Sequence, residues 1–599
     1  MNRSSGSTDA ASSALVSGSQ LQPVPPAPRV QRIPGRNSVL TIGLEDYYHA
    51  ASFRHWIRPE TWYRFENRLG KTTRRALDLL DRCNARATFF VDRQTAKFAP
   101  ELVREVASRG HEVASRGDYA DTPRELGAAR FRERAVRCRE EVEQIVGRRV
   151  LGFRLAGDRL SAGELWVLDV LAECGYLYDS SIGPALGTNA TKVLRHYQRY
   201  KPQLSHRLFH EVPISSIALL GLEVPIADGG SLRHLPSAWM RNAVDHWHRN
   251  RSEPYVMYFR TWELDPEQPR LNAGPAAVRL WHYRNLDRMA DLLEQFLAPH
   301  RFTTVAEHLG LEYPIQHAAV EKVASTSQNI SLRRAPELVL SAARTRDPAG
   351  PIQVSVVVPC FNESQSLRYL NNTLRSLTET LSEQYAFTFV FVDDGSTDDT
   401  WSTLQSLFGG RADCQLVRHE QNFGAARSIQ TGLRHAETHI VCSIDCDCTY
   451  DPHELAGMIP LLTEDVDVVT ASPYHPEGKV RNVPAWRLFL SRRLSRLYRL
   501  VLRQKLFTYT SCFRVYRKHT TAALEIKNPG FLGVAEFMAK ADLAGRRIVE
   551  YPTTLEVRVL GHSKMKILRT IAGHLSLLAD LARLRLSRGN GTDGLGAQS

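Results

Sequence analysis

Apolar and polar positions alternate regularly in two separate regions of the chain. From Ser38 to about Pro314, short β-branched runs alternate with amphipathic stretches, and the same alternation resumes at Gln353 and continues to about Leu584. Strand-length runs that alternate with helix-length patterns are typical of α/β folds built on parallel sheets. We therefore predict two α/β domains, which agrees with a length of 599 residues, too long for one hydrophobic core.

The predicted domain borders follow changes in composition. The first residues are rich in Ser, Pro, Ala and Gly, the last are rich in Gly, and the stretch between the two regions ends in a turn-forming Asp-Pro-Ala-Gly-Pro sequence. We predict disordered tails over 1–37 and 586–599, a linker over 316–352, and folded domains over 38–315 and 353–585.

Three apolar runs in the second region are each followed by polar residues. The runs span 354–358, 387–392 and 439–444 and are typical of buried parallel strands. Because open α/β sheets bind ligands at the carboxyl ends of their strands, we expect these polar residues to form one site. They are Pro359, Asn362 and Glu363 after the first run, Asp393 and Asp394 after the second, and Asp445 and Asp447 after the third.

The aspartates indicate the chemistry of this site. Asp445 and Asp447 are two residues apart on a predicted strand end, so their side chains face the same way and can bind one ion together. Mg²⁺ or Mn²⁺ binds through one or two carboxylates together with substrate phosphates, and it can neutralise a diphosphate leaving group. Asp394 is suited to hydrogen-bond a ribose or a base. We predict a nucleotide-sugar site that uses Mg²⁺ or Mn²⁺.

The same residues belong to a longer series of spaced motifs. This series resembles the family 2 glycosyltransferases of GT-A fold, most closely the branch containing dolichyl-phosphate mannose synthase, over nearly all of residues 353–584. The motifs are Val-Pro-Cys-Phe-Asn-Glu at 358–363, Val-Asp-Asp-Gly-Ser-Thr-Asp at 392–398, Asn-Phe-Gly at 422–424, Asp-Cys-Asp-Cys-Thr-Tyr-Asp-Pro at 445–452, Thr-Ser-Cys-Phe-Arg-Val-Tyr at 510–516 and Arg-x-x-Gly-His-Ser-Lys at 558–564.

The resemblance implies roles for individual residues. It implies that Asp445 and Asp447 bind the metal and the diphosphate. It also implies phosphate contacts, to donor or acceptor, near the C-terminus. The nucleotide would be held by Pro359, Asn362, Glu363, Asp393 and Asp394, and phosphate by Arg514, Arg558, Ser563 and Lys564, which are basic or hydroxyl-bearing.

The acceptor determines whether a general base is needed. A phosphate acceptor is largely ionised near neutral pH and needs no strong base, whereas a sugar hydroxyl needs a carboxylate. Glu536 lies where family members often carry a carboxylate, so it is a candidate base or acceptor-orienting residue. A glutamate on a helix surface is the alternative interpretation.

The first region carries a second series of motifs. A predicted strand ends in Glu45 and Asp46, and further motifs follow at 87–91, 109–117, 151–154, 178–181, 211–213 and 258–266. The series resembles the polysaccharide deacetylases of carbohydrate esterase family 4 over about residues 38–313. Strands alternating with helices predict an irregular (β/α) barrel with carboxylates at one mouth.

The deacetylase resemblance implies a divalent metal held by one Asp and two His, beside a carboxylate base. Glu45 stands at the base position and Asp46 at the metal-ligand position, but Arg116 and Ala120 replace the two histidines and Arg260 stands near the place of a late catalytic histidine. Arginine has no lone pair for a metal, but it can pair with Glu45 and Asp46. We predict an inactive deacetylase fold.

Net charge and composition indicate possible partners and the cellular location of the protein. The net charge of +13 favours an anionic partner, but no nucleic-acid-binding motif is present. No window has the ~20 apolar residues of a membrane span, and no signal-peptide core or Cys-x-x-Cys pair is present, so we expect a cytoplasmic protein. Residues 486–507 and 567–584 form basic amphipathic patterns that favour contact with the inner face of the cell membrane. Packing of both on the domain is the alternative.

Three functional hypotheses follow. The leading one is a metal-dependent, inverting glycosyltransferase that moves a sugar from a nucleotide-sugar donor to a polyprenyl-phosphate or saccharide acceptor. The second adds a deacetylase site rebuilt from His49, His55 or Asp118. The third is a non-catalytic, glycan-binding scaffold, which the complete set of strand-end carboxylates disfavours.

Overall fold

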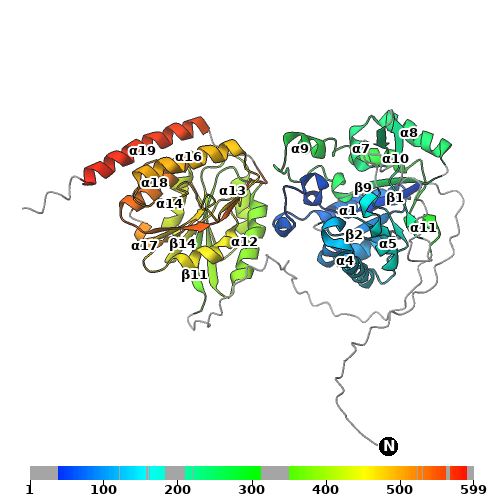
Figure 1. Ribbon diagram of the computed structural model, residues 1–599, viewed down its shortest axis with the longest axis horizontal. Helices are drawn as coiled ribbons and strands as arrows, with labels where there is room; N and C mark the ends of the chain where they lie inside the picture. Colours follow the sequence, from blue (N-terminus) through cyan, green and yellow to red (C-terminus); the bar gives the residue numbers. More distant parts are fainter. Residues whose placement is uncertain are drawn as a thin grey trace, which may run out of the picture.

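The computed structural model describes residues 38–311 and 350–589, except 120–121, 157–159, 161, 183–208, 220–221, 252, 522–523, 529 and 562–566. It has two α/β halves, coloured blue to green and yellow-green to red (Figure 1). The predicted tail over 1–37 and nearly all of the predicted linker lie outside the described residues. The last helix, α19 (Ile567–Gly589), continues past the border predicted at 585. Its leucines at 577, 578 and 581 pack into the core of the second half.

The N-terminal half is built on an eight-stranded sheet. Its order is β10-β1-β2-β3-β4-β5-β6, with β9 also beside β1, and every pairing is parallel. The predicted barrel is therefore observed as a parallel half-barrel. The strands are β1 (Ser38–Gly43), β2 (Thr88–Asp92), β3 (Glu112–Arg116), β4 (Gly152–Arg154), β5 (Tyr178–Asp179), β6 (His210–Glu211), β9 (Tyr255–Arg260) and β10 (Phe302–Thr303).

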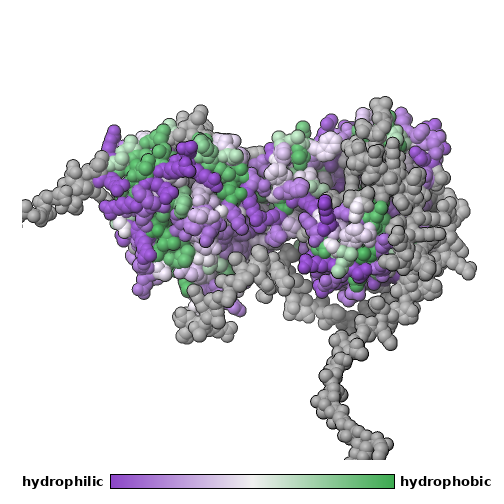
Figure 2. Space-filling model, viewed as in Figure 1, coloured by the Kyte–Doolittle hydropathy of each residue, from purple (hydrophilic) through white to green (hydrophobic). Residues whose placement is uncertain are grey.

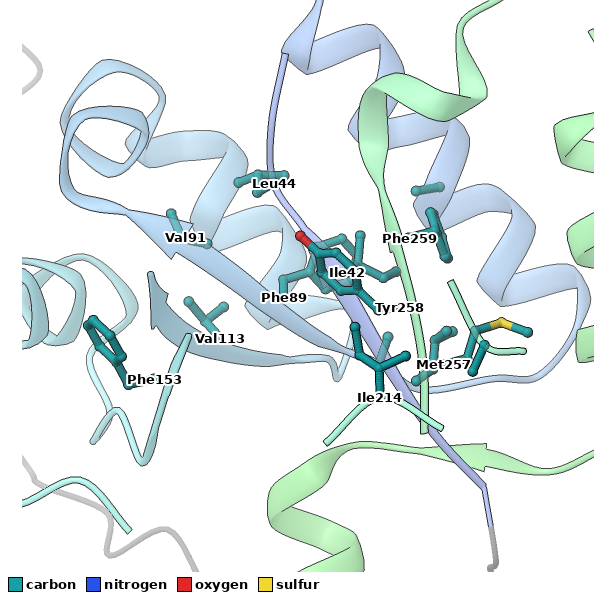
Figure 3. Packing of buried hydrophobic residues seen from close by; sticks show 14 of the residues in the cluster. Ile42, Leu44, Phe89, Val91, Val113, Phe153, Ile214, Met257, Tyr258 and Phe259 are labelled. Atoms are coloured by element: carbon teal, nitrogen blue, oxygen red, sulfur yellow. The ribbon is translucent and has the colours of Figure 1, made fainter. Parts of the chain in front are cut away.

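Both faces of this sheet are covered. Alternate residues of β1 point to opposite sides: Leu40 and Ile42 pack in the main core, whereas Val39 packs in a smaller cluster on the other face. Figure 3 shows Ile42 among the side chains of neighbouring strands, including Phe89 and Met257. Because all strands are parallel, their carboxyl ends lie at one edge. The helices with buried faces include α1 (Leu69–Arg82), α4 (Pro123–Val146), α5 (Trp166–Glu173), α8 (Ser237–Asn250) and α10 (Met289–Leu297).

The C-terminal half has a seven-stranded mixed sheet. Its order is β13-β12-β11-β14-β17-β15-β18, and β17 runs antiparallel to both of its neighbours. The predicted α/β, Rossmann-like class is confirmed. The strands are β11 (Ile352–Cys360), β12 (Tyr385–Asp393), β13 (Cys414–Arg418), β14 (Ile440–Ser443), β15 (Val468–Ser472), β17 (Arg514–Arg517) and β18 (Ile548–Pro552). The principal helices are α12 (Leu367–Leu381), α13 (Thr400–Phe408), α14 (Ala425–His435), α16 (Ala485–Val501), α18 (Gly530–Leu543) and α19.

The two halves share apolar packing. One continuous cluster of buried side chains includes Phe65 and Leu271 from the first half together with Leu370 and Leu560 from the second. The short helix η3 (Pro59–Arg64) lies against α12. A cavity of about 450 Å³ remains between the halves, lined by residues of both. No helix in the described part of the chain is long and apolar enough to cross a membrane.

Candidate functional site

The loop after β11 is fastened to the loop after β12 by Asn362. Asn362 adopts a left-handed backbone conformation (φ +52°), which asparagine tolerates better than most residues. Its backbone N–H donates to Ser396 Oγ (2.8 Å), and its side-chain oxygen accepts from the backbone N–H groups of Thr397 (2.7 Å) and Asp398 (3.3 Å). Asn362 therefore shapes the strand-end edge on which Pro359, in β11, also lies.

Asp394 holds the loop that enters α14. Its two carboxylate oxygens accept from the backbone N–H groups of Phe423 (2.9 Å) and Gly424 (2.7 Å), and one of them also bonds His419 Nδ1 (2.8 Å). The neighbouring Asp393 lies 3.2 Å from Arg418 Nε. In this structure the Asp394 carboxylate organises the loop, and the ribose or base contact suggested by the sequence pattern stays a prediction.

Asp447, Glu363 and Arg558 converge at the ends of β11 and β14. Arg558 Nε donates to Asp447 Oδ2 (2.6 Å), and Arg558 Nη1 lies 2.9 Å from Glu363 Oε1. Asp447 Oδ1 accepts from the backbone N–H of Thr449 (3.0 Å), which orients the carboxylate. The arginine therefore bridges a predicted metal ligand and a predicted nucleotide contact.

Asp445 lies in the electrostatic field of this cluster. Burial, followed by the charge of Asp447, raises the pKa of Asp445 to about 7, while Arg558 opposes the rise. A divalent cation would relieve the repulsion between the two aspartates. Within the described residues no three His, Cys, Asp or Glu side chains could hold a metal by themselves. A pair of carboxylates still fits Mg²⁺ or Mn²⁺, because substrate phosphates supply further ligands to these ions.

Two predicted residues face the protein interior. The Arg514 guanidinium is buried and donates to the backbone carbonyls of Tyr509 (3.0 Å) and Val534 (3.1 Å). Glu536 on α18 is 2% exposed, and its carboxylate accepts from the backbone N–H groups of Lys527 and Asn528 and pairs with Lys540. These contacts give both residues structural partners, and the phosphate contact of Arg514 and the base or acceptor-orienting role of Glu536 stay predictions. Ser563 and Lys564 lie outside the described residues, as does Ala120.

The N-terminal sheet also gathers charged residues at its carboxyl edge. Arg116 Nη2 lies 2.7 Å from Glu45 Oε1, and both side chains are at most 2% exposed. Tyr258 donates to the same oxygen (3.1 Å), and Arg260 Nε lies 3.8 Å away. The predicted arginine–carboxylate pairing is therefore found for Glu45.

Asp46 has different partners from those predicted. Its carboxylate accepts from the backbone N–H groups of Tyr47 (2.9 Å), Arg68 (2.7 Å) and Leu69 (3.1 Å), so it joins two loops and does not pair with Arg116. Burial raises the pKa of Asp46 to about 7, although these hydrogen bonds oppose the rise. His49, a candidate for a rebuilt site, lies in an aromatic cluster, and burial holds its pKa well below the ordinary value.

Family comparisons agree with this division of the chain. The profile of Glycosyl transferase family 2 matches residues 355–523, which include the strand ends described above. The C-terminal half is a family 2 glycosyltransferase domain. The profile of Polysaccharide deacetylase matches residues 59–178, and a domain of unknown function, DUF3473, matches 180–310.

Similar proteins with known names match the glycosyltransferase domain. A dolichol-phosphate mannosyltransferase from Pyrococcus furiosus is 26% identical over 217 residues, which are 36% of this chain and 60% of that protein. A dodecaprenyl-phosphate galacturonate synthase from Rhizobium johnstonii is 29% identical over 251 residues, 40% of this chain and 70% of that protein. A solved glucosyl-3-phosphoglycerate synthase from Mycobacterium tuberculosis is 19% identical, covers 39% of this chain and 78% of its own, and has a TM-score of 0.30.

Some contacts of the site have no counterpart in the sequence pattern. The motifs single out Arg558 as basic, but they do not indicate that it bridges Asp447 and Glu363. Nor do they indicate that Asp451, on the loop that carries Asp445 and Asp447, pairs with Arg64 of the other half (2.5 Å). Asp451 is the last aspartate of the Asp-Cys-Asp-Cys-Thr-Tyr-Asp-Pro motif, so the motif singles out its position. The motif does not indicate its partner, because Arg64 is far away in sequence.

Proposed function

We propose that the chain is a metal-dependent, inverting glycosyltransferase that moves a sugar from a nucleotide-sugar donor to a polyprenyl-phosphate acceptor. The observation that carries the proposal is the convergence of Asp447, Glu363 and Arg558, with Asp445 beside them, at the strand ends of a family 2 glycosyltransferase domain. A saccharide acceptor is the alternative that the same site could serve.

Asp445 and Asp447 are the residues that would hold Mg²⁺ or Mn²⁺. Bound there, the ion would neutralise charge on the nucleotide diphosphate as it leaves. Arg558 is placed to meet a phosphate brought to Asp447, because a guanidinium binds phosphate oxygens well. The loop that Asn362 and Asp394 organise would receive the nucleotide. In an inverting transfer, an acceptor oxygen attacks the anomeric carbon of the donor sugar. The bond between this carbon and the diphosphate oxygen breaks on the opposite face.

The environment of Glu536 favours a phosphate acceptor. Its carboxylate is engaged by backbone N–H groups and by Lys540, which leaves it poorly suited to remove a proton from a sugar hydroxyl. An ionised phosphate needs no such base. Two similar proteins are named for dolichol phosphate and dodecaprenyl phosphate, and these names support the same acceptor class.

We further propose that the N-terminal half has no metal-dependent deacetylase activity. Arg116 forms an ion pair with Glu45, which stands at the position of the catalytic base in the resembled family. A guanidinium cannot serve as a metal ligand. Release of acetate from N-acetylated oligosaccharides by the full chain, lost on Glu45→Gln substitution, would contradict this assignment.

The transfer reaction tests the main proposal. The full chain is incubated with UDP- and GDP-sugars and undecaprenyl phosphate in detergent, with Mg²⁺, Mn²⁺ or EDTA, and lipid-linked product is measured. We expect product only with a divalent ion. Asp447→Ala should lower turnover by about two orders of magnitude or more, because the metal loses one of its two carboxylates.

Asp465→Ala is the matched control, since Asp465 is an exposed aspartate of the same domain. We expect it to keep normal turnover. Product formation in EDTA, or normal turnover of the Asp447→Ala variant, would refute the metal site. Transfer to oligosaccharides but not to undecaprenyl phosphate would replace the acceptor with the saccharide alternative.

A further inference from the structure

The loop that carries the two metal-site aspartates is anchored by the other half of the molecule. Asp451 lies on this loop, after Asp445 and Asp447, and its Oδ2 accepts from Arg64 Nη2 at 2.5 Å. Arg64 belongs to η3 of the N-terminal half, and its side chain is only 4% exposed. Asp451 also accepts from the backbone N–H of His453 (3.1 Å) and so caps the turn that ends the loop. The Asp451 carboxylate therefore links the end of the loop to the N-terminal half.

Charge strengthens this contact. Burial alone would raise the pKa of Asp451, but the positive charge of Arg64, helped by His453, holds it well below the ordinary value. The pair therefore remains an ion pair over the whole physiological pH range. Arg64 is buried, whereas the Asp451 side chain is 33% exposed, so salt screens the pair less than it would a pair in which both partners are fully exposed.

Arg64 is itself fixed to the glycosyltransferase domain. Asn372 on α12 donates from its side chain to the backbone carbonyls of Arg64 (3.1 Å) and Phe65 (3.2 Å). The Phe65 ring packs edge-on against Tyr369, also on α12, with ring centres 5.0 Å apart. These contacts hold η3 in one place, so the direction from which Arg64 reaches Asp451 is defined.

A second contact fixes the other side of the site. The backbone N–H of Asn272 in the N-terminal half donates to the carbonyl of Val559, and Leu271 pairs with Leu560 in an antiparallel bridge. Both leucines are buried. Val559 follows Arg558 directly, so the backbone that carries the bridging arginine is held by the N-terminal half.

We propose that the deacetylase-like half is a positioning module for the glycosyltransferase site, acting through Arg64 on the 445–451 loop and through Asn272 on the Arg558 segment. This inference rests on the proposed function. Arg64 and Asn272 act through Asp451 and Val559, which are not among the residues assigned to the metal or the nucleotide, so they are positioning residues. Displacements of about 1 Å in reacting groups can lower rates about a hundredfold, which gives such anchoring a functional value.

The test uses the full chain with Arg64→Ala and Arg64→Lys. Hydrogen–deuterium exchange is followed in the peptides that cover 445–454 and 556–561, and Mn²⁺ binding and steady-state transfer are measured on the same samples. In Arg64→Ala we expect exchange about tenfold faster in 445–454, Mn²⁺ binding about tenfold weaker, and kcat lower by about ten- to a hundredfold with little change in the KM for the acceptor. Arg64→Lys should recover part of each effect, since it keeps the charge.

Arg139→Ala is the matched control. Arg139 is a partly buried arginine that donates to the carbonyl of Cys174 within the N-terminal half, away from the shared core. We expect it to leave exchange in 445–454 and transfer unchanged. Equal effects of the Arg64 and Arg139 variants would overturn the positioning role.

The outcomes also separate this inference from the proposed function. Normal exchange and normal transfer in Arg64→Ala would overturn the positioning role while the transferase proposal stands. Faster exchange and weaker Mn²⁺ binding in Arg64→Ala, in a chain that transfers no sugar, would support the anchoring of the loop and overturn the transferase proposal.

Discussion

Two arginines lie next to carboxylates at positions where the resembled families bind a metal, and their surroundings differ. Arg116 and Glu45 are both at most 2% exposed, so their charges are enclosed and can be satisfied only by each other and by nearby protein groups. Arg558 is 21% exposed, so an incoming cation can compete for its carboxylate partners and an incoming phosphate can compete for its guanidinium. Under the proposed function, the first arginine would take the place of an ion, whereas the second would belong to a site that exchanges partners.

The enclosed pair predicts a large effect of removing one partner. We expect Arg116→Met to lower the free energy of unfolding by about 3 kcal/mol, because Glu45 is left as a buried charge with weaker partners. Urea denaturation followed by fluorescence measures the change. No gain of deacetylase activity is expected, since methionine does not restore the missing histidine ligands of the metal.

The Glu45→Gln/Arg116→Met double variant is the control for this prediction. Once both charges are gone, the penalty of an unpaired buried charge is removed. We therefore expect the double variant to lose less stability than the sum of the two single variants, by at least about 1 kcal/mol. Additive effects would show that Glu45 and Arg116 do not stabilise each other.

At the scale of elements, the sequence predicts strands better than it predicts the partners of side chains. β11, β12 and β14 were expected from β-branched runs, and each ends within two residues of the predicted polar residues. The convergence of Asp447 with Glu363 follows from parallel strand order alone. By contrast, Asp394 and Arg514 were recognised by type and motif, but their hydrogen-bond partners come from loops and helices whose positions depend on tertiary packing.

The helix α16 shows a face that internal packing does not use. Tyr498 is fully buried, while Leu500 (76%), Phe489 (58%) and Trp486 (49%) are exposed among arginines. Figure 2 shows hydrophobic residues beside hydrophilic ones in this part of the glycosyltransferase domain. Exposed aromatic and aliphatic side chains interleaved with arginine suit the interface of an anionic membrane. This arrangement would bring the domain to the lipid in which a polyprenyl phosphate lies.

Membrane binding can be tested on this helix. We expect the full chain to sediment with vesicles containing anionic phospholipid, and the Trp486→Ala/Phe489→Ala/Leu500→Ala variant to bind at least about tenfold more weakly, because it loses most of the apolar surface on this face. Leu280→Ala/Trp281→Ala removes exposed apolar side chains of the N-terminal half and should bind normally. Equal binding by the two variants would argue against α16 as the contact.

At the scale of the whole molecule, the shared core determines how the halves respond to stress. Interfaces between domains of one chain are often polar and permit relative motion. Here Phe65 and Leu271 of the first half lie in one apolar cluster with Leu370 and Leu560 of the second. The cluster is reinforced by the ion pair between the buried Arg64 and the partly exposed Asp451. The two halves should therefore unfold together, even though each has its own sheet.

Calorimetry of the full chain tests this coupling. We expect one cooperative unfolding transition for the wild-type chain, and two separate transitions for Phe65→Ala, which removes a buried ring from the interface at a cost of about 3–5 kcal/mol. Leu77→Ala, which truncates a buried side chain in the core of the N-terminal half, should lower the melting temperature but keep a single transition. Two transitions in the wild-type chain would mean that the halves are not energetically coupled. A single transition in both variants would mean that Phe65 does not couple the two halves. Phe65→Ala would then only destabilise the chain, as Leu77→Ala does.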